Sequence, residues 1–212
     1  MTKLLSLFLV LISPLVALGQ EQCGTFDQSE LVFAQVSKIK GKKGEKAYFY
    51  KHGGKCPDGP NCKTRAFVLP EDLVMVSSPT DYSGCVRYVS EKGVETTGWI
   101  MGKHLNYDAV PLPLASWAGT WRDESGDYEI NIKQEGTQLK VSGVGAFDMG
   151  NGTVNNGSFE GKSRPNNGIL VIEEGECKVS IANLKTRLYV AATLACGGMN
   201  VVFDGTYRKS WQ

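Results

Sequence analysis

Tyr128-Glu-Ile-Asn-Ile-Lys133 and Leu139-Lys-Val-Ser-Gly-Val144 each alternate apolar with polar side chains. Successive side chains of a β-strand point to opposite sides, so this alternation indicates strands with one buried face. Asn151-Gly152, Asn156-Gly157 and Asn167-Gly168 follow along the chain and supply residues that tolerate the positive φ of tight hairpin turns. This half of the chain is therefore expected to be a run of short antiparallel strands.

Further segments of the same kind complete a set of eight expected strands. They cover Gly119–Arg122, Tyr128–Gln134, Gln138–Gly145, Val154–Gly161, Gly168–Glu173, Cys177–Leu184, Arg187–Ala192 and Val201–Arg208. Eight antiparallel strands in so short a stretch favour an up-and-down barrel, because closure removes the exposed edges. A barrel of this size has an interior that side chains can fill or that can hold one small ligand.

The barrel half opens with Trp117-Ala-Gly-Thr-Trp121 and ends with Phe203-Asp-Gly-Thr-Tyr-Arg208. These motifs resemble the Gly-x-Trp start and the terminal basic residue of the calycin superfamily, which includes lipocalins and streptavidin. The resemblance implies that Trp121 closes the barrel floor and that Arg208 packs across its ring. A guanidinium over an indole stabilises a fold by roughly 0.5–2 kcal/mol. Both roles are structural and name no ligand.

The first half carries its own ordered set of motifs. Ala47-Tyr-Phe-Tyr50, Arg65–Val76, Cys85-Val-Arg-Tyr-Val89, Thr97-Gly-Trp-Ile100 and then His104-Leu105 follow one another. Over this span the chain resembles the bacterial SH3-like (SH3b) domains, with their strand–turn–strand unit and Gly-Trp-Ile ending. It departs from them in a long insert, Lys51–Lys63, which holds two cysteines.

The chain as a whole is expected to be all-β, an SH3-like barrel followed by a second small antiparallel barrel. Outside the signal segment no window shows helical periodicity over three turns. Asp108-Ala-Val-Pro-Leu-Pro-Leu-Ala115 favours an extended joint because prolines disfavour helix. The predicted organisation is a signal peptide (1–19), an SH3-like domain (20–107), a linker (108–116) and a calycin-like barrel (117–212).

The first residues have the pattern of a cleaved signal peptide. Lys3 precedes an apolar run, Leu4–Leu18, and small residues at Ala17 and Gly19 suit a cut before Gln20. The run is too short to span a bilayer, and Pro14 argues against a retained membrane anchor. The expected location is the periplasm or the medium, with no transmembrane span after cleavage.

All six cysteines follow the expected cleavage site. An even number of cysteines in an exported chain indicates disulfides. A zinc site is disfavoured, because the cysteine spacing lacks the close ligand pairs of a zinc ribbon or finger. Cys177 and Cys196 flank one expected hairpin and should pair. The other four allow three pairings; the turn Pro57-Asp-Gly-Pro60 favours the one that joins Cys56 to Cys62 and Cys23 to Cys85.

The charge balance disfavours nucleic acid as a partner. Loss of Lys3 from the 23 basic residues leaves 22, equal to the 22 acidic ones. Nucleic-acid binding needs a surplus of Lys and Arg along one face. The basic run Lys38–Lys43 is interpreted as a solvated loop or hairpin tip.

The sequence also lacks a recognisable catalytic constellation. The two histidines, His52 and His104, have no nucleophile elbow beside them. Adjacent carboxylates such as Glu173-Glu174 would point to opposite faces of a strand, which spoils a shared acid–base site. No catalytic residue, metal site or cofactor is predicted.

A binding role is therefore expected, with Tyr50, Tyr82 and Trp99 as candidate ligand contacts in a groove of the SH3-like half. The ligand would be cell-wall peptidoglycan or an envelope protein. One alternative is a periplasmic inhibitor or immunity protein against a lysozyme or amidase, which would present the loops Cys196–Asn200 and Lys51–Lys63. Another is a carrier with a small ligand inside the second barrel.

Overall fold

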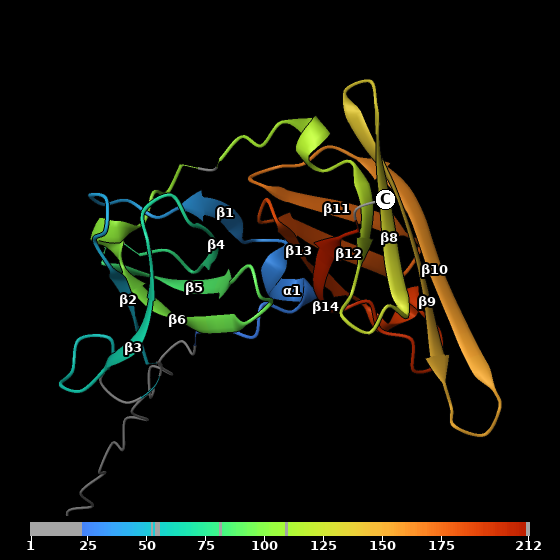
Figure 1. Cartoon of the computed structure of the whole chain (residues 1–212), viewed down its shortest axis with the longest axis horizontal. Helices are drawn as coiled ribbons and strands as arrows, with labels where there is room; N and C mark the ends of the chain where they lie inside the picture. Colours follow the sequence, from blue (N-terminus) through green and yellow to red (C-terminus); the bar gives the residue numbers. More distant parts are fainter. Residues whose placement is uncertain (1–22, 52, 54–55, 81, 109, 211–212) are drawn as a thin grey trace, which may run out of the picture.

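The computed structural model describes residues 23–51, 53, 56–80, 82–108 and 110–210. The expected signal peptide (1–19) and its cleavage site at Gly19-Gln20 lie outside these residues, as does His52. The described chain is all-β, with two antiparallel sheets, one of them a nearly closed barrel (Figure 1). Within the described residues no helix has the length and apolar character needed to cross a membrane.

The first sheet has six strands in the order β1-β4-β5-β6-β2-β3. Their bounds are β1 Gln35–Lys38, β2 Ala47–Tyr50, β3 Lys63–Val68, β4 Leu73–Ser77, β5 Ser83–Val89 and β6 Glu95–Met101. A short 3-10 turn, η1 (Gly102–His104), follows, and a bridge from Ile39 to Leu105 brings this end of the sheet back onto the region after β1. The core inside this curved sheet includes Phe49, Val76 and Ile100.

The second sheet has eight strands in the order β10-β9-β8-β7-β14-β13-β12-β11. Their bounds are β7 Gly119–Arg122, β8 Tyr128–Glu135, β9 Gln138–Asp148, β10 Val154–Ser163, β11 Ile169–Glu174, β12 Cys177–Asn183, β13 Arg187–Ala192 and β14 Gly205–Lys209. The eight-stranded meander predicted from the sequence is confirmed. Pairing of β14 with β7 joins its two ends.

The barrel has one seam, between β10 and β11. No backbone ladder joins these two strands in the described sheet order. The carboxylate of Glu174 instead accepts a hydrogen bond from the Glu160 backbone amide at 3.2 Å. Gly161 packs against Ile172 across the same seam, where a Cβ would approach within 2.6 Å of that side chain. Side-chain contacts therefore join β10 to β11 in place of backbone hydrogen bonds.

Large side chains fill the barrel interior. Trp117, Trp121, Phe203 and Tyr207 are at most 1% exposed and belong to one apolar cluster with the inward residues of the strands. The rings of Phe159 and Phe203 meet edge to face at 4.9 Å. A filled interior gives the carrier hypothesis no support.

The cation that faces Trp121 is Lys209, so the expected role of Arg208 is wrong. The Lys209 ammonium lies 5.3 Å from the centre of the Trp121 ring, and Lys209 is the strand partner of Trp121. Tyr207 points into the barrel and Arg208 outward, because side chains alternate along β14. Arg208 is one residue before the strand partner of Trp121, so its guanidinium lies on the outer face of the barrel.

A third apolar cluster joins the two sheets, and a short helix lies at its centre (Figure 1). The helix α1 (Gln28–Leu31) was not predicted, because four residues are too few to show helical periodicity. Buried residues of the segment before β1, of the first sheet and of the outer barrel face meet here: Phe26, Leu31, Ala34, Met75, Trp99, Ile169, Ala182, Tyr189 and Ala191. The two sheets therefore share one core.

Polar contacts fix how the sheets meet. Arg87 of β5 donates to the hydroxyl of Tyr189 on β13, and its guanidinium lies 5.3 Å from the Phe26 ring. Burial raises the pKa of Tyr189 to about 12. The backbone amide of Val36 donates to the Asn167 carbonyl at 2.8 Å. A Cβ at the adjacent Gly168 would lie 2.5 Å from Val36, so glycine permits this approach.

The predicted linker is held against the molecule and is not a free spacer. Val110 donates its amide to the Val36 carbonyl at 3.1 Å, and Val110 and Leu112 pack on the shared core. The segment then forms a 3-10 turn, η2 (Leu114–Ser116), in place of a fully extended joint.

Three disulfides are present, Cys23–Cys85, Cys56–Cys62 and Cys177–Cys196. The first ties the segment before α1 to β5, so it holds the helix against the first sheet. No described cysteine is free. Disulfides of this number are typical of proteins that fold in an oxidising compartment.

Replacement of Asp27 by Ala should destabilise the protein by about 1 kcal/mol, because Asp27 caps α1. Its carboxylate accepts hydrogen bonds from the Ser29 and Glu30 amides at 2.9 and 3.2 Å. Asp27→Asn keeps an acceptor oxygen, so its free energy of unfolding should fall by less. Urea unfolding of the three proteins at pH 7 measures the difference, and equal stability of D27A and wild type would contradict the capping role.

The same carboxylate predicts a pH dependence. The hydrogen bond from the Ser29 side chain, despite opposing desolvation, lowers the pKa of Asp27 below its usual value of 3.8. A lowered folded-state pKa means that the ionised group stabilises the fold above its ordinary range and that this contribution disappears as pH falls through the folded value. The stability difference between wild type and D27N should therefore shrink on acidification from pH 5 to pH 2.

Replacement of Lys209 by Ala should cost about 0.5–2 kcal/mol, because the ammonium faces the Trp121 ring. Arg208→Ala should change the free energy of unfolding by less than about 0.5 kcal/mol, since Arg208 is exposed on the other face of β14. Lys209→Arg keeps a cation over the ring and serves as the conservative control. A larger loss from R208A than from K209A would restore the original expectation for Arg208.

Candidate functional site

The three aromatic residues expected to form a groove do not act as one surface. Tyr50 and Trp99 are neighbours across β2 and β6. Trp99, however, is only 6% exposed, because the shared core covers its ring. Tyr82 is 80% exposed in the turn before β5. Trp99 is therefore a core residue, and a ligand could reach only Tyr50 and Tyr82.

A hollow beside Tyr50 gathers cations and rings. It has a volume of about 210 Å³ and is lined by Lys46, Tyr48, Tyr50, Lys63 and Lys103, together with Glu45, Met101 and His104. The Lys63 ammonium lies 3.6 Å from the centre of the Tyr48 ring, a cation–π contact. We call this set, Lys46, Tyr48, Tyr50, Lys63 and Lys103, the basic–aromatic groove.

The basic run Lys38–Lys43 ends close to this groove. The backbone amide of Lys40 donates to the carbonyl of His104, which lines the groove, at 2.8 Å. His104 is buried, with its Nδ1 3.9 Å from the Glu45 carboxylate. The region can hold carboxylate or phosphate groups by charge and can stack a flat group on Tyr50.

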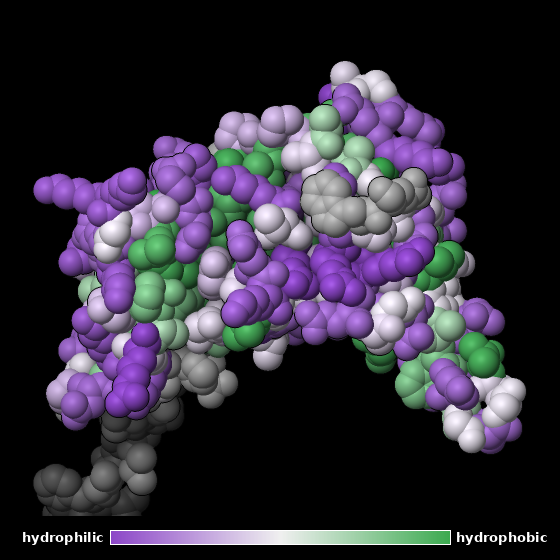
Figure 2. Space-filling model, in the orientation of Figure 1, coloured by the Kyte–Doolittle hydropathy of each residue, from purple (hydrophilic) through white to green (hydrophobic). Residues whose placement is uncertain are grey.

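A second surface projects from the barrel. The hairpin of β9 and β10 runs well past the other strands, so that its turn forms the far corner of the molecule (Figure 1). In the space-filling view this projection shows green apolar residues among pale and purple ones (Figure 2). The loop after η3 (Leu194–Cys196) lies against it, because the Asn155 side-chain amide donates to the Met199 carbonyl at 2.8 Å.

We call residues 146–154 of the hairpin and 194–202 of the loop the hairpin–loop surface. Charge is almost absent from this region of the sequence: only Asp148 is charged between residues 141 and 159, and no residue is charged between 188 and 203. Large apolar side chains are exposed instead, namely Phe147, Met149, Val154, Leu194, Met199 and Val202. Exposed apolar side chains that gather in one region of a soluble protein favour an interaction site there.

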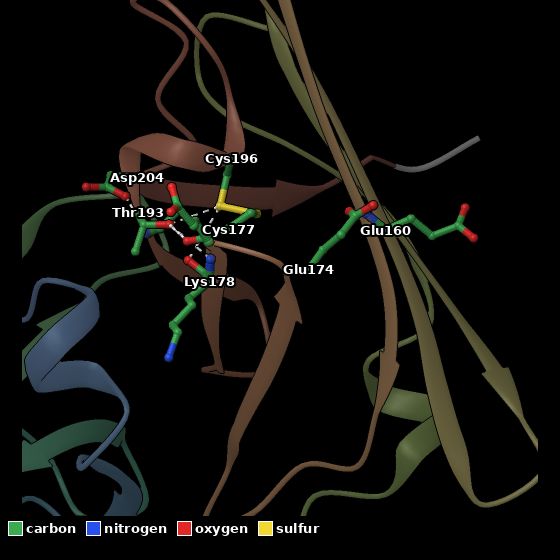
Figure 3. The surroundings of a disulfide bond; sticks show 9 residues. Glu160, Glu174, Cys177, Lys178, Thr193, Cys196 and Asp204 are labelled. Carbon is green, nitrogen blue, oxygen red and sulfur yellow. Dashed lines mark hydrogen bonds between the residues drawn. A yellow bond between two sulfur atoms is a disulfide. The ribbon is translucent and has the colours of Figure 1, made fainter.

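The Cys177–Cys196 disulfide holds the loop in place (Figure 3). Beside it the Thr193 hydroxyl accepts from the Lys178 amide and donates to the Glu176 carbonyl, each at 3.0 Å. Asp204 accepts from the Ala192 amide at 2.6 Å, and burial raises the pKa of its carboxyl. The loop is thus braced at both ends.

Gly157 lets the hairpin touch the loop, and Gly197 lets the loop fold closely on itself. A Cβ at Gly157 would lie 2.4 Å from the Gly197 carbonyl oxygen, and one at Gly197 would lie 2.1 Å from the Val201 carbonyl oxygen. Asn156-Gly157 was expected to be a turn, but it lies within β10. Its glycine serves close packing, whereas the turn of the hairpin contains Asn151-Gly152.

The two loops proposed for an inhibitor are far apart. The described part of the insert Lys51–Lys63 lies with β2 and β3 at one end of the long axis, and the hairpin of β9 and β10 lies at the other (Figure 1). The loop Cys196–Asn200 therefore has the hairpin as its neighbour, which the sequence reasoning did not include. The lack of charged residues at 141–159, apart from Asp148, and at 188–203 was the sequence signal that could have identified the hairpin–loop surface.

In the part of the chain that the structure describes, no three His, Cys, Asp or Glu side chains gather as a metal site would require. Of the adjacent carboxylates, Glu173 forms an ion pair with Lys178 at 3.3 Å, whereas Glu174 bridges the seam to β10. The two side chains thus have separate structural partners.

Comparisons with protein-family models, curated proteins and solved structures found no match to this chain. Its function is therefore inferred from its own residues.

Proposed function

We propose that this chain is an exported, non-catalytic binding protein of the cell envelope, and that the hairpin–loop surface docks a partner protein. The expected signal peptide and the three disulfides support an oxidising compartment such as the periplasm. The observation that carries the proposal is that a surface that projects into solvent has exposed apolar side chains and a single charge, Asp148.

Protein-binding surfaces are depleted in charge at their centres and enriched in aromatic residues and Met. The hairpin–loop surface has this composition, with Phe147, Met149 and Met199 exposed and Asp148 its single charge. Contact with an anionic membrane is disfavoured, because interfacial segments carry Lys and Arg beside their apolar residues. No Lys or Arg occurs at residues 141–159 or 188–203.

The shape of this surface suits a concave partner. The hairpin projects from the barrel, and the disulfide and its hydrogen bonds hold the loop, so little conformational entropy is lost on docking. A rigid projection of this kind is suited to the cleft of an enzyme. A wall hydrolase of the lysozyme or amidase type is the partner class that an inhibitor or immunity protein of the envelope would address.

A second candidate function, retention on the cell wall, is favoured by the basic–aromatic groove. The lysines at positions 46, 63 and 103 line it beside Tyr48 and Tyr50. Peptide stems of peptidoglycan carry carboxylates, which lysines can pair with, and Tyr50 offers a ring face. The resemblance of this half to bacterial SH3-like domains agrees with such a role.

Replacement of Met199 by Asp should abolish capture of the partner protein, because a charge at the centre of an apolar interface is desolvated without a pair. The oxidised chain from Gln20 onward is used as bait in an envelope extract, and the purified chain is added in parallel to lysozyme and amidase assays. Met199 is 74% exposed, so the substitution should leave the fold intact.

Val94→Asp is the matched control, since Val94 is 62% exposed in the turn between β5 and β6, away from the hairpin. It should capture the same protein as wild type. Equal capture by M199D would refute docking at this surface. Capture of a protein that is not a hydrolase would keep the docking surface and reject the inhibitor role.

Replacement of Lys63 and Lys103 by Gln should weaken sedimentation with purified peptidoglycan about tenfold, because two charge-assisted contacts are lost. Binding by wild type should also fall as salt rises. Lys92→Gln, at an exposed lysine of the β5–β6 turn, is the control and should sediment like wild type. If wild type stays in the supernatant, the wall-binding function is rejected, whatever the result for the hairpin–loop surface.

A further inference from the structure

Three arginines stand in a row on the outer face of the barrel. Strand register places Arg208 of β14 directly opposite Arg187 of β13 on one side and Arg122 of β7 on the other. Directly opposite residues of antiparallel strands share one face of the sheet. Like charges in that position destabilise a sheet, so a row of three needs counter-charge.

Protein carboxylates supply only part of that charge. Arg122 is paired with Glu129, whose carboxylate accepts from its Nε and lies 2.8 Å from its Nη2. Arg187 donates through Nη2 to the Glu91 carbonyl at 2.8 Å, and its Nη1 lies 3.5 Å from the Glu124 carboxylate. Among the described residues, Arg208 in the middle of the row has no ion pair.

Arg187 provides the second observation. It is 7% exposed, and its Nη1 is buried without a hydrogen-bond partner among the described residues. The contact with Glu124 at 3.5 Å is therefore electrostatic and leaves the donor unused. A buried guanidinium donor left unpaired is costly, which makes it a place where an oxyanion would bind.

The row lines an open cleft of about 1040 Å³ between the barrel and the β5–β6 turn. Lys185 and Lys209 also line the cleft, but the Lys209 ammonium lies over the Trp121 ring, so the cations that a ligand in the cleft can meet are Arg122, Arg187, Arg208 and Lys185. Its third acid besides Glu91 and Glu124 is Asp123, whose carboxylate is occupied by the Gly126 and Tyr128 amides at 2.9 and 3.1 Å. These amides hold the carboxylate in place, and the arginine of the cleft that has no ion pair among the described residues is Arg208.

We propose that this cleft binds a phosphate group, held by Arg208 and by Nη1 of Arg187, which has no hydrogen-bond partner among the described residues, with Arg122 and Lys185 adding positive charge. Guanidinium groups pair with phosphate through two parallel hydrogen bonds. The site is separate from the hairpin–loop surface and from the basic–aromatic groove, so it gives the binding protein a small-ligand site of its own.

The test measures thermal unfolding and calorimetric binding of the oxidised chain from Gln20 onward with inorganic phosphate, against chloride and acetate at equal ionic strength. Wild type should gain a rise in Tm with phosphate that chloride and acetate do not produce. In Arg208→Gln the affinity for phosphate should fall at least about tenfold. Without phosphate this variant should unfold at the wild-type temperature or above it, because a like-charge contact is removed.

Arg65→Gln, at an exposed arginine on the edge strand β3, is the matched control and should respond to phosphate as wild type does. An equal phosphate response of R208Q and wild type would overturn the site. An equal response of wild type to acetate would overturn the assignment to phosphate. Titration with glycerol phosphate then separates a free phosphate ligand from a phosphate ester, since only a site open to esters binds both.

Discussion

The apolar outer face of the barrel is the constraint on which the rest of the molecule depends. Ile169, Ala182, Tyr189 and Ala191 point away from the barrel interior, yet they are buried. If these side chains were exposed to water, the fold would lose roughly 25 cal/mol of stability for each Å² of apolar surface. The first sheet and α1 cover it, so the two sheets form one body in which Arg87 and Tyr189 meet. That docking also places Glu91 against Arg187 and so creates one wall of the arginine cleft.

A filled barrel moves any binding activity to the outside of the molecule. Trp117, Trp121, Phe203 and Tyr207 occupy the space in which a carrier would hold a ligand. The outside of the molecule has three features of different chemistry: the nearly uncharged hairpin–loop surface, the basic–aromatic groove and the arginine cleft. They lie on different parts of the chain, so one protein could engage a protein partner and an anionic ligand at once.

Local sequence patterns predicted most of the strands, because a half-buried strand must alternate apolar and polar residues. The patterns did not predict an element too short to show a periodicity, nor contacts that depend on how two strands are aligned. The helix α1 has four residues, and its existence depends on the Asp27 cap and on burial of Leu31 between the sheets. Arg208 was assigned to Trp121 because a basic residue was expected near the chain end, but the pairing of β14 with β7 places Lys209 there. Trp99 was expected in a groove, and the docking of the second sheet buried it.

The sequence by itself determined the all-β class, the strand segments of the barrel and the presence of cysteines in numbers that suit disulfides. These properties depend on alternation and composition, which neighbouring residues carry. Only the tertiary structure decided that Arg122, Arg187 and Arg208 form a row, that Met199 lies beside the hairpin and that Trp99 is buried. Each depends on contacts between segments distant in sequence. Strand register and sheet docking set those contacts, and both arise from the burial of apolar surface across the whole chain.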